Sequence, residues 1–174
     1  MRVIDLSWIL AGPYCTMLLA DYGAEVLKIE QPESGDGIRQ WGPPWLGGES
    51  AYFLSANRNK KSVTLNLQTA EGLAILKKLL LDADVLIENF KPGTLSRLGL
   101  DPKTLAADYP ALINCSITGS ADGEPSKVGV AKLSHSPANI HSAPPILGAD
   151  TDAVLSELGF TSEQRAGLRE QGVI

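Results

Sequence analysis

Short apolar runs alternate along the chain with stretches in which apolar residues recur at helical spacing. The apolar or alternating runs predict strands at 3–6, 24–30, 62–67, 84–89 and 111–117. Helical spacing, proline starts and glycine stops predict helices at 13–22, 71–81, 102–110, 151–158 and 161–172. Because strands and helices alternate over 1–119, the sequence predicts βαβ units, a mostly parallel sheet with flanking helices and an α/β fold.

The predicted sheet also indicates where a ligand would bind. Ligands of parallel sheets lie outside the carboxyl ends of the strands, so the loops expected to matter are 7–13, 31–48 and 89–97. Residues 31–50 are rich in glycine and proline and are predicted to form one long loop.

The C-terminal part of the chain is predicted to form two short amphipathic helices. Thr161 and Gln164 have the spacing of a capping box at the start of the second helix. Helices this short do not fold alone, so we expect them to dock on the α/β body or on a partner.

Composition and charge narrow the class of protein. The chain has 174 residues, of which 44% are hydrophobic and 20% charged, and these values are typical of a globular domain. A net charge of −5 argues against a broad nucleic-acid surface but leaves room for a local anion site.

No apolar run approaches the roughly 18 residues of a membrane span. The start does not read as a signal peptide, which predicts a cytoplasmic protein, or a mitochondrial matrix protein if a transit peptide has been removed. Two distant cysteines, Cys15 and Cys115, predict neither a disulfide framework nor a metal site.

Two stretches in the first third of the chain are candidate binding elements. "SWILAGPYCT" (7–16) places a glycine-proline turn before a helix, where backbone amides can receive a phosphate or carbonyl, although an ordinary strand-to-helix turn has the same pattern. It is neither a Walker loop nor a GxGxxG motif. "NRNKKS" (57–62) clusters three cations and predicts a solvated loop, unless it faces a polyanionic ligand.

"ENFKPGTLSRLG" (88–99) is the third candidate. Phe90 can stack a purine, Asn89 can bond its edge and Arg97 can pair with a phosphate. A buried phenylalanine beside a turn asparagine explains the same residues, and both interpretations stay open.

The remaining chemistry-bearing residues have no recognisable spacing. His135 and His141 are expected at the surface, without the spacing of metal ligands. The tryptophans Trp8, Trp41 and Trp45 are expected to pack the loops together. The early carboxylates have no partner recognisable by spacing, and they are Asp5, Asp21, Glu30 and Asp36.

Long motifs in order resemble the family III CoA-transferases. They are "MRVIDLSWILAGPYCTMLLADYGAEVLKIEQPESGD", "NRNKKSVTLNL", "DVLIENFKPGTLSRLGL" and "INCSITG", and they cover 1–119 almost continuously. "DGEPSKVGVA" (122–131) and the stretch 143–174 resemble the same family. The family includes formyl-CoA, carnitine-related and succinate-hydroxymethylglutarate CoA-transferases, with α-methylacyl-CoA racemase as a relative.

The resemblance implies a Rossmann-like large domain that has lost internal segments. It makes 1–131 the N-terminal part of that domain and 132–174 its C-terminal tail, with the family's small domain missing. The family's aspartate nucleophile, which attacks the acyl-CoA thioester, falls in a stretch with no counterpart here, so the resemblance identifies no catalytic residue. The histidine and aspartate of the racemase branch fall in the same stretch. Asp122, next to the join, is the best placed of the substitutes considered, which also include Asp21 and Asp36.

The resemblance also implies a CoA-binding face. The carried-over contacts are Ile9, Leu10, Ala11, Leu65, Asn89, Phe90 and Arg97. Gln31 and Gln68 stand where relatives often carry a basic residue for the CoA phosphates, which weakens the expected affinity. The implied ligand is CoA or acyl-CoA, without a metal, a nucleic acid or a membrane, and the implied protein partner is a second copy or a full-length relative.

Three functions follow from these observations. The first is CoA transfer between an acyl-CoA and a carboxylate acceptor, which the missing nucleophile leaves unexplained; a racemase-like reaction is its variant. The second is a non-catalytic product that keeps residual CoA binding. The third is an interaction protein that pairs with a full-length relative.

Overall fold

A five-stranded parallel sheet forms the centre of the molecule. The structure, a computed structural model, describes residues 1–117 and 141–174. The sheet has the order β5-β2-β1-β6-β7, and each neighbouring pair is parallel, which confirms the predicted α/β fold. Its strands are β1 (Arg2–Asp5), β2 (Glu25–Glu30), β5 (Lys60–Thr64), β6 (Val85–Glu88) and β7 (Ile113–Ser116).

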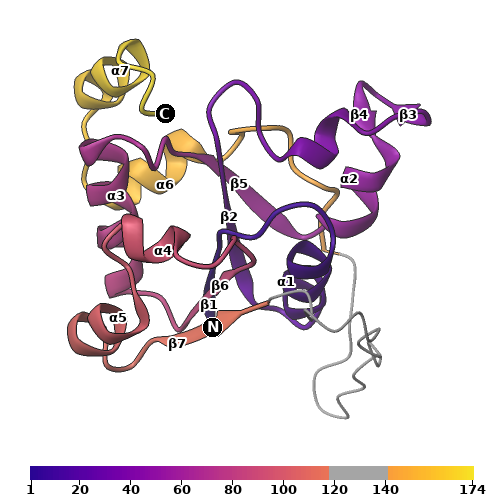
Figure 1. The fold of residues 1–174 in the computed structure, drawn as a ribbon. Coiled ribbons are helices and arrows are strands. Elements are labelled where there is room, and N and C mark those ends of the chain that lie inside the picture. Colours follow the sequence, from indigo (N-terminus) through magenta and orange to yellow (C-terminus); the bar gives the residue numbers. More distant parts are fainter. Residues whose placement is uncertain (118–140) are drawn as a thin grey trace.

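Helices cover both faces of this sheet (Figure 1). On one face lies α1 (Ala11–Asp21), which packs on β1, β2 and β6. On the other face lie α3 (Ala70–Leu81), α4 (Thr94–Arg97), α5 (Pro102–Asp108) and α6 (Thr151–Glu157).

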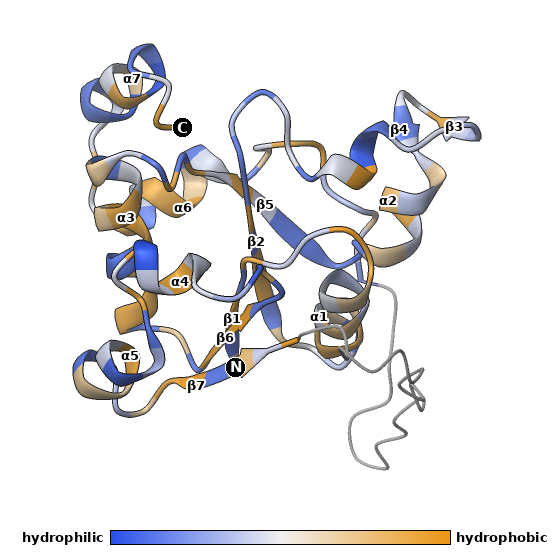
Figure 2. Cartoon of the chain, viewed as in Figure 1, coloured by the Kyte–Doolittle hydropathy of each residue, from blue (hydrophilic) through white to orange (hydrophobic). Residues whose placement is uncertain are grey.

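The two faces of the sheet differ in polarity. The face under α3 to α6 is apolar along its length, with Ile4, Leu27 and Leu86 in one large cluster. The face under α1 begins apolar, at Val3 and Val26, and becomes polar toward the carboxyl ends of the strands. Figure 2 shows this polarity in the hydrophilic colouring of β5 inside the fold. The polar half of this face is buried and forms part of the site described below.

The stretch 31–50 is more structured than the sequence predicted. It contains the short 3₁₀-helix η1 (Gly37–Gln40) and a hairpin of β3 (Trp45–Leu46) and β4 (Glu49–Ser50), and it leads directly into the unpredicted helix α2 (Ala51–Ala56). The prediction of one long loop was therefore wrong. Local caps explain the difference, because Asp36 accepts a hydrogen bond from the Ile38 amide and Ser50 accepts bonds from the first amides of α2.

The C-terminal helices dock on the sheet, as predicted. Val154 and Leu155 of α6 and the terminal Val173 and Ile174 belong to the same apolar cluster as the strands. The helix α7 (Ser162–Glu170) begins with the predicted capping box, formed by Thr161 and Gln164. The predicted boundary between 131 and 132 lies outside the described residues and stays a prediction.

The segment before α6 covers the outer edge of β5. The Asp150 carboxylate accepts a bond from the Ser62 amide at 2.9 Å, and the Thr151 hydroxyl accepts one from the Thr64 amide at 2.9 Å. The Asp150 amide donates in turn to the Ser62 carbonyl at 3.0 Å. These bonds satisfy backbone groups that an edge strand otherwise leaves open.

None of the helices in the described ranges 1–117 and 141–174 combines the length and the apolar character needed to cross a membrane.

Candidate functional site

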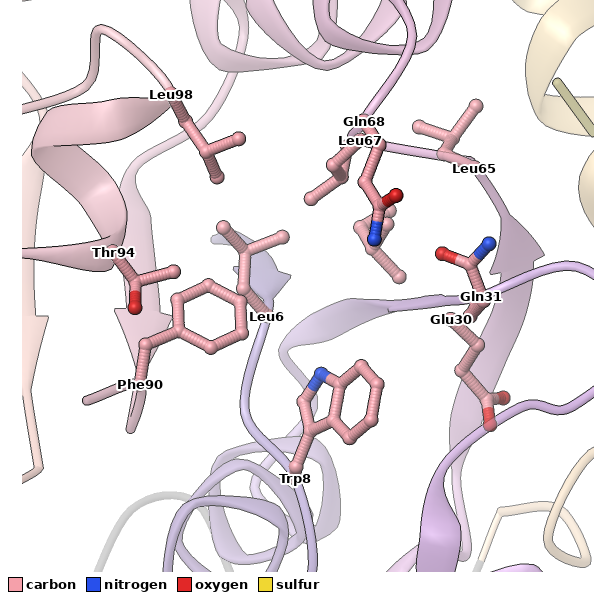
Figure 3. A pocket seen from close by; sticks show the side chains of 11 residues that line it. Leu6, Trp8, Glu30, Gln31, Leu65, Leu67, Gln68, Phe90, Thr94 and Leu98 are labelled. Atoms are coloured by element: carbon pink, nitrogen blue, oxygen red, sulfur yellow. The ribbon is translucent and has the colours of Figure 1, made fainter.

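A pocket lies at the carboxyl ends of the central strands (Figure 3). Its volume is ≈ 180 Å³. The sheet order reverses on either side of β1, so the pocket lies beside the topological switch point where α/β sheets bind ligands. The lining residues are Leu6, Trp8, Ile29, Glu30, Gln31, Leu65, Leu67, Gln68, Phe90, Thr94 and Leu98.

The pocket combines aromatic rings, an apolar floor and neutral amides. Trp8 and Phe90 lie on the β1 and β6 side, on either side of Leu6, while the amides of Gln31 and Gln68 lie across the pocket from Phe90 (Figure 3). Trp8 is 37% exposed, so part of its ring is open to a ligand. Such a surface suits a flat, uncharged ring with hydrogen-bonding edges.

Three of the residues carried over from the resemblance lie in or beside the pocket. Leu65 and Phe90 line it. Arg97 lies at the end of α4, is exposed, and donates from Nη2 to the Thr94 hydroxyl at 3.1 Å. Because Thr94 itself lines the pocket, the guanidinium is at the α4 rim.

The amide of Asn89 joins two loops. Its Oδ1 accepts a bond from the Trp8 backbone N–H at 2.7 Å, and its Nδ2 donates to the Trp8 carbonyl at 2.8 Å. The asparagine therefore ties the loop after β6 to the loop after β1 and fixes the backbone that carries the Trp8 ring.

The residues Ile9, Leu10 and Ala11 do not line the pocket. Leu10 and Ala11 are exposed at the start of α1, where no side chain caps the helix. Ile9 has a left-handed backbone with φ 68, and its N–H donates to the Asp36 carboxylate at 3.1 and 3.2 Å. This turn, which the sequence pattern did not reveal, presents Trp8 to the pocket.

A buried ion pair stabilises the loop that follows β1. The Lys28 ammonium donates to the Asp36 carboxylate at 2.8 Å, and both side chains are at most 1% exposed. It also donates to the Ser7 carbonyl at 2.9 Å. The pair thus holds the loop after β1 at two points, Ser7 and Ile9.

A second buried ion pair joins β1 to β5. The Lys60 ammonium lies 3.2 Å from the Asp5 carboxylate, which also accepts bonds from the hydroxyls of Ser7 and Thr16. Burial lowers the pKa of Lys60 to about 8, although Asp5 acts in the opposite direction. Burial alone would raise the pKa of Asp5, but the charges of Lys60 and Lys28 and the two hydroxyl bonds hold it below its usual value.

A third cluster centres on Glu30 at the end of β2. Arg39 donates to both Glu30 oxygens at 2.8 Å, and Ser62 donates to one of them at 2.6 Å. Arg39 also bonds Glu49 and lies 3.6 Å from the centre of the Phe53 ring. Burial would raise the pKa of Glu30, but the bonds from Arg39 and the charge of Lys28 keep it lowered. Glu30 therefore lines the pocket as a carboxylate whose charge is already balanced.

These clusters add partners that the sequence did not reveal and correct one sequence-based expectation. All four early carboxylates have cationic partners, which lie 8 to 55 residues away without a regular spacing; they are Asp5, Asp21, Glu30 and Asp36. Lys60 in "NRNKKS" is buried rather than solvated, while Arg58 pairs with Asp21 at the part-buried end of α1. One signal for these ion pairs was available, because the alternation of β2 places Lys28 and Glu30 on one face of the sheet. Alternation does not show whether that face is covered by other elements.

The other sequence candidates contribute little to the site. His141 is exposed, and its backbone N–H donates to Asn59. Trp41 meets Tyr52 edge to face at 6.2 Å between ring centres, and Trp41 and Trp45 stay about half exposed. His135 and Asp122 lie outside the described residues. Within the described residues, no three His, Cys, Asp or Glu side chains come together as metal ligands.

Comparison with known proteins gives matches in sequence and in fold. The model of CoA-transferase family III matches residues 1–128. Over 119 residues the chain is 50% identical to the succinyl-CoA:glutarate CoA-transferase of Mus musculus, a match that covers 68% of this chain and 27% of that protein. Over 137 residues it is 44% identical to the beta subunit of succinyl-CoA–L-malate CoA-transferase of Chloroflexus aurantiacus, covering 78% of this chain and 34% of that protein.

A solved structure matches nearly the whole chain. The crystal structure of a CAIB/BAIF family protein from Brucella suis matches with a TM-score of 0.65 and 35% identity, over 99% of this chain and 50% of that one. The chain thus spans about a third or less of these curated relatives and half of this solved structure.

Proposed function

Because the chain belongs to CoA-transferase family III, we propose that it binds coenzyme A and acyl-CoA in the pocket at the carboxyl ends of β1, β2, β5 and β6. The observation that carries this proposal is the pocket between Trp8 and Phe90 at the switch point of the sheet. The names of the relatives, which act on succinyl-CoA, support an acyl-CoA ligand.

The size of the pocket indicates which part of the ligand enters it. A volume of ≈ 180 Å³ is below the roughly 300–1,000 Å³ of pockets that enclose a whole drug-sized ligand. One ring system fits, so we place the adenine against Phe90 and Trp8 and leave the pantetheine chain on the surface. The Arg97 guanidinium at the rim is available to a phosphate.

Calorimetric titration with CoA tests the binding site. Stacking on an aromatic side chain contributes about 1–3 kcal/mol, so Phe90→Ala should weaken binding at least about fivefold. Arg97→Ala should also weaken it, whereas Arg169→Ala, on the exposed side of α7, is the matched control. Tight binding that neither pocket variant changes would contradict the proposal.

We further propose that this chain does not transfer CoA by itself. Glu30, the carboxylate among the described lining residues, is held in a buried ion pair, as are Asp5 and Asp36 in the loops and strands beside it. Glu88 is buried and accepts a bond from the Phe90 N–H at 2.7 Å. Loss of a catalytic nucleophile costs on the order of 10⁴–10⁶ in rate. The transfer chemistry named for the relatives would then need residues beyond those described.

Hydroxylamine trapping tests this second statement. The purified chain is incubated with several acyl-CoA donors and carboxylate acceptors, and covalent acyl-protein is then trapped. We expect no adduct. An adduct that disappears in Asp122→Ala would identify a replacement nucleophile and overturn the proposal.

Pairing with a longer relative is a second candidate function. It is favoured by the match of nearly the whole chain to half of a solved structure, and by the 64% exposure of Ile113 on the edge strand β7. Light scattering at micromolar concentration tests for self-association, and co-purification with a full-length relative tests for mixed pairs.

A further inference from the structure

The charge distribution around the pocket is one-sided. The lining residues in the described part of the chain include no lysine or arginine. The one lining carboxylate, Glu30, is neutralised by two bonds from Arg39. The interior of the pocket therefore offers a ligand aromatic, aliphatic and amide contacts but no net charge.

Two exposed cations lie on the side of α4. Arg97 is bonded to the lining Thr94, and Lys91 follows the lining Phe90 directly in sequence and is exposed. The opposite rim, at the ends of β2 and β5, carries the amides of Gln31 and Gln68 (Figure 3). A phosphate at the α4 rim can meet a cation, whereas the described lining residues on the amide side include no lysine or arginine.

CoA carries two separate phosphate groups, which is why this asymmetry matters. The diphosphate joins the ribose to the pantetheine chain. Its position is therefore limited by the positions of the adenosine and the pantetheine on either side of it. The 3′-phosphate is a terminal substituent that can turn toward water, where its charge is screened within about 8 Å at physiological salt. With the diphosphate at the α4 rim, the described lining residues offer no second cation to the 3′-phosphate.

We propose that the Gln31 and Gln68 rim makes this site indifferent to the ribose 3′-phosphate, so that it binds 3′-dephospho-CoA as well as CoA. The inference rests on the proposed CoA-binding function and adds that the site does not recognise the 3′-phosphate of the ligand. The two amides instead donate to and accept from the uncharged edges of the base, as glutamine does with adenine.

Calorimetry with CoA and with 3′-dephospho-CoA on the full chain tests the inference. The two dissociation constants should agree within about threefold at physiological salt. In Gln68→Lys the loss of the amide affects both ligands alike, and the new ammonium should shift the ratio of the two affinities about five- to tenfold in favour of CoA. Gln40→Lys is the matched control, because it adds the same charge at an exposed position outside the lining. The unfolding temperature of each variant shows that it is folded.

The outcomes separate this inference from the proposed function. If CoA binds at least about tenfold more tightly than 3′-dephospho-CoA to the unchanged chain, the site reads the 3′-phosphate and the inference is wrong. It is also wrong if Gln68→Lys tightens both ligands equally. If neither ligand binds, the proposed CoA site itself fails.

Discussion

Replacing Lys60 by methionine should destabilise the protein far more than replacing the neighbouring Lys61. Lys60 is buried, pairs with Asp5 at 3.2 Å and also donates to the Pro13 carbonyl and to Asn57. Methionine keeps most of the volume but leaves the Asp5 carboxylate without its partner. Breaking a buried pair in this way costs about 3–5 kcal/mol. At about 2–4 °C per kcal/mol for a chain of this size, the unfolding temperature should fall by roughly 6–20 °C.

Lys61→Met supplies the control within the same strand. Lys61 pairs with Glu25 at 2.7 Å, but their side chains are 42% and 36% exposed. Exposed pairs contribute about 0–1 kcal/mol, so this variant should unfold within a few degrees of the unchanged protein. Urea unfolding, followed by circular dichroism at pH 7, gives both free energies.

The pH dependence distinguishes a lost ion pair from a packing defect. In the unchanged protein the pKa of Asp5 is lowered, so the stability it contributes is lost as pH falls through the folded-state value. Without Lys60, Asp5 loses the charge that opposes burial most strongly, so its pKa should rise. Asp5 then binds a proton more readily in the folded state, and the deficit of Lys60→Met should be smaller at pH 5 than at pH 7. A deficit within about 0.5 kcal/mol of that of Lys61→Met would refute the reasoning.

Four further predictions have defined outcomes. The pKa of Lys60 is lowered from 10.5 to about 8, so the unfolded state binds more protons between these values. Relative to Lys60→Met, the stability of the unchanged protein should therefore rise between pH 8 and 10.5, on the order of 3 kcal/mol by urea midpoints. Gly12→Ala should cost about 1–3 kcal/mol in thermal unfolding, because the added Cβ would overlap the buried Ser7 side chain. Gly167→Ala in α7 meets open space and should stabilise by about 0.5–1 kcal/mol. Thr161→Ala removes the capping box and should cost about 1 kcal/mol, seen as faster amide exchange across 162–170.

Local sequence signals were sufficient for the sheet but not for the elements beside it. The strands are continuous apolar or alternating runs, and each lies within a few residues of its predicted place. The helix α2 and the 3₁₀-helix η1 have only short patterns of their own. They are stabilised by contacts such as Arg39 stacked on Phe53, which no local pattern contains.

The site was predictable to a similar degree. Leu65 and Phe90 follow strand ends directly, and their place at the pocket could be anticipated from the topology. The role of Asn89 could not, because its partner is the Trp8 backbone, which is 81 residues away. The buried pair of Lys60 and Asp5 was missed for the same reason, since they are 55 residues apart. The pairs of Lys28 with Asp36 and of Arg39 with Glu30 are only 8 and 9 residues apart, but each joins β2 to the loop after it at no helical or strand spacing.

The bonds between the β5 edge and the segment around Asp150 have a consequence for how the chain can vary in length. Within the described residues the last strand of the sheet ends at Ser116, and Ser142, whose carbonyl accepts a bond from the Asn59 amide, lies beyond the connection. Residues on both sides of this connection therefore hydrogen-bond to the sheet. The entropic cost of joining the ends of a connecting loop grows only slowly with the length of the loop. We therefore expect residues added between these two points to leave the register of the five described strands unchanged.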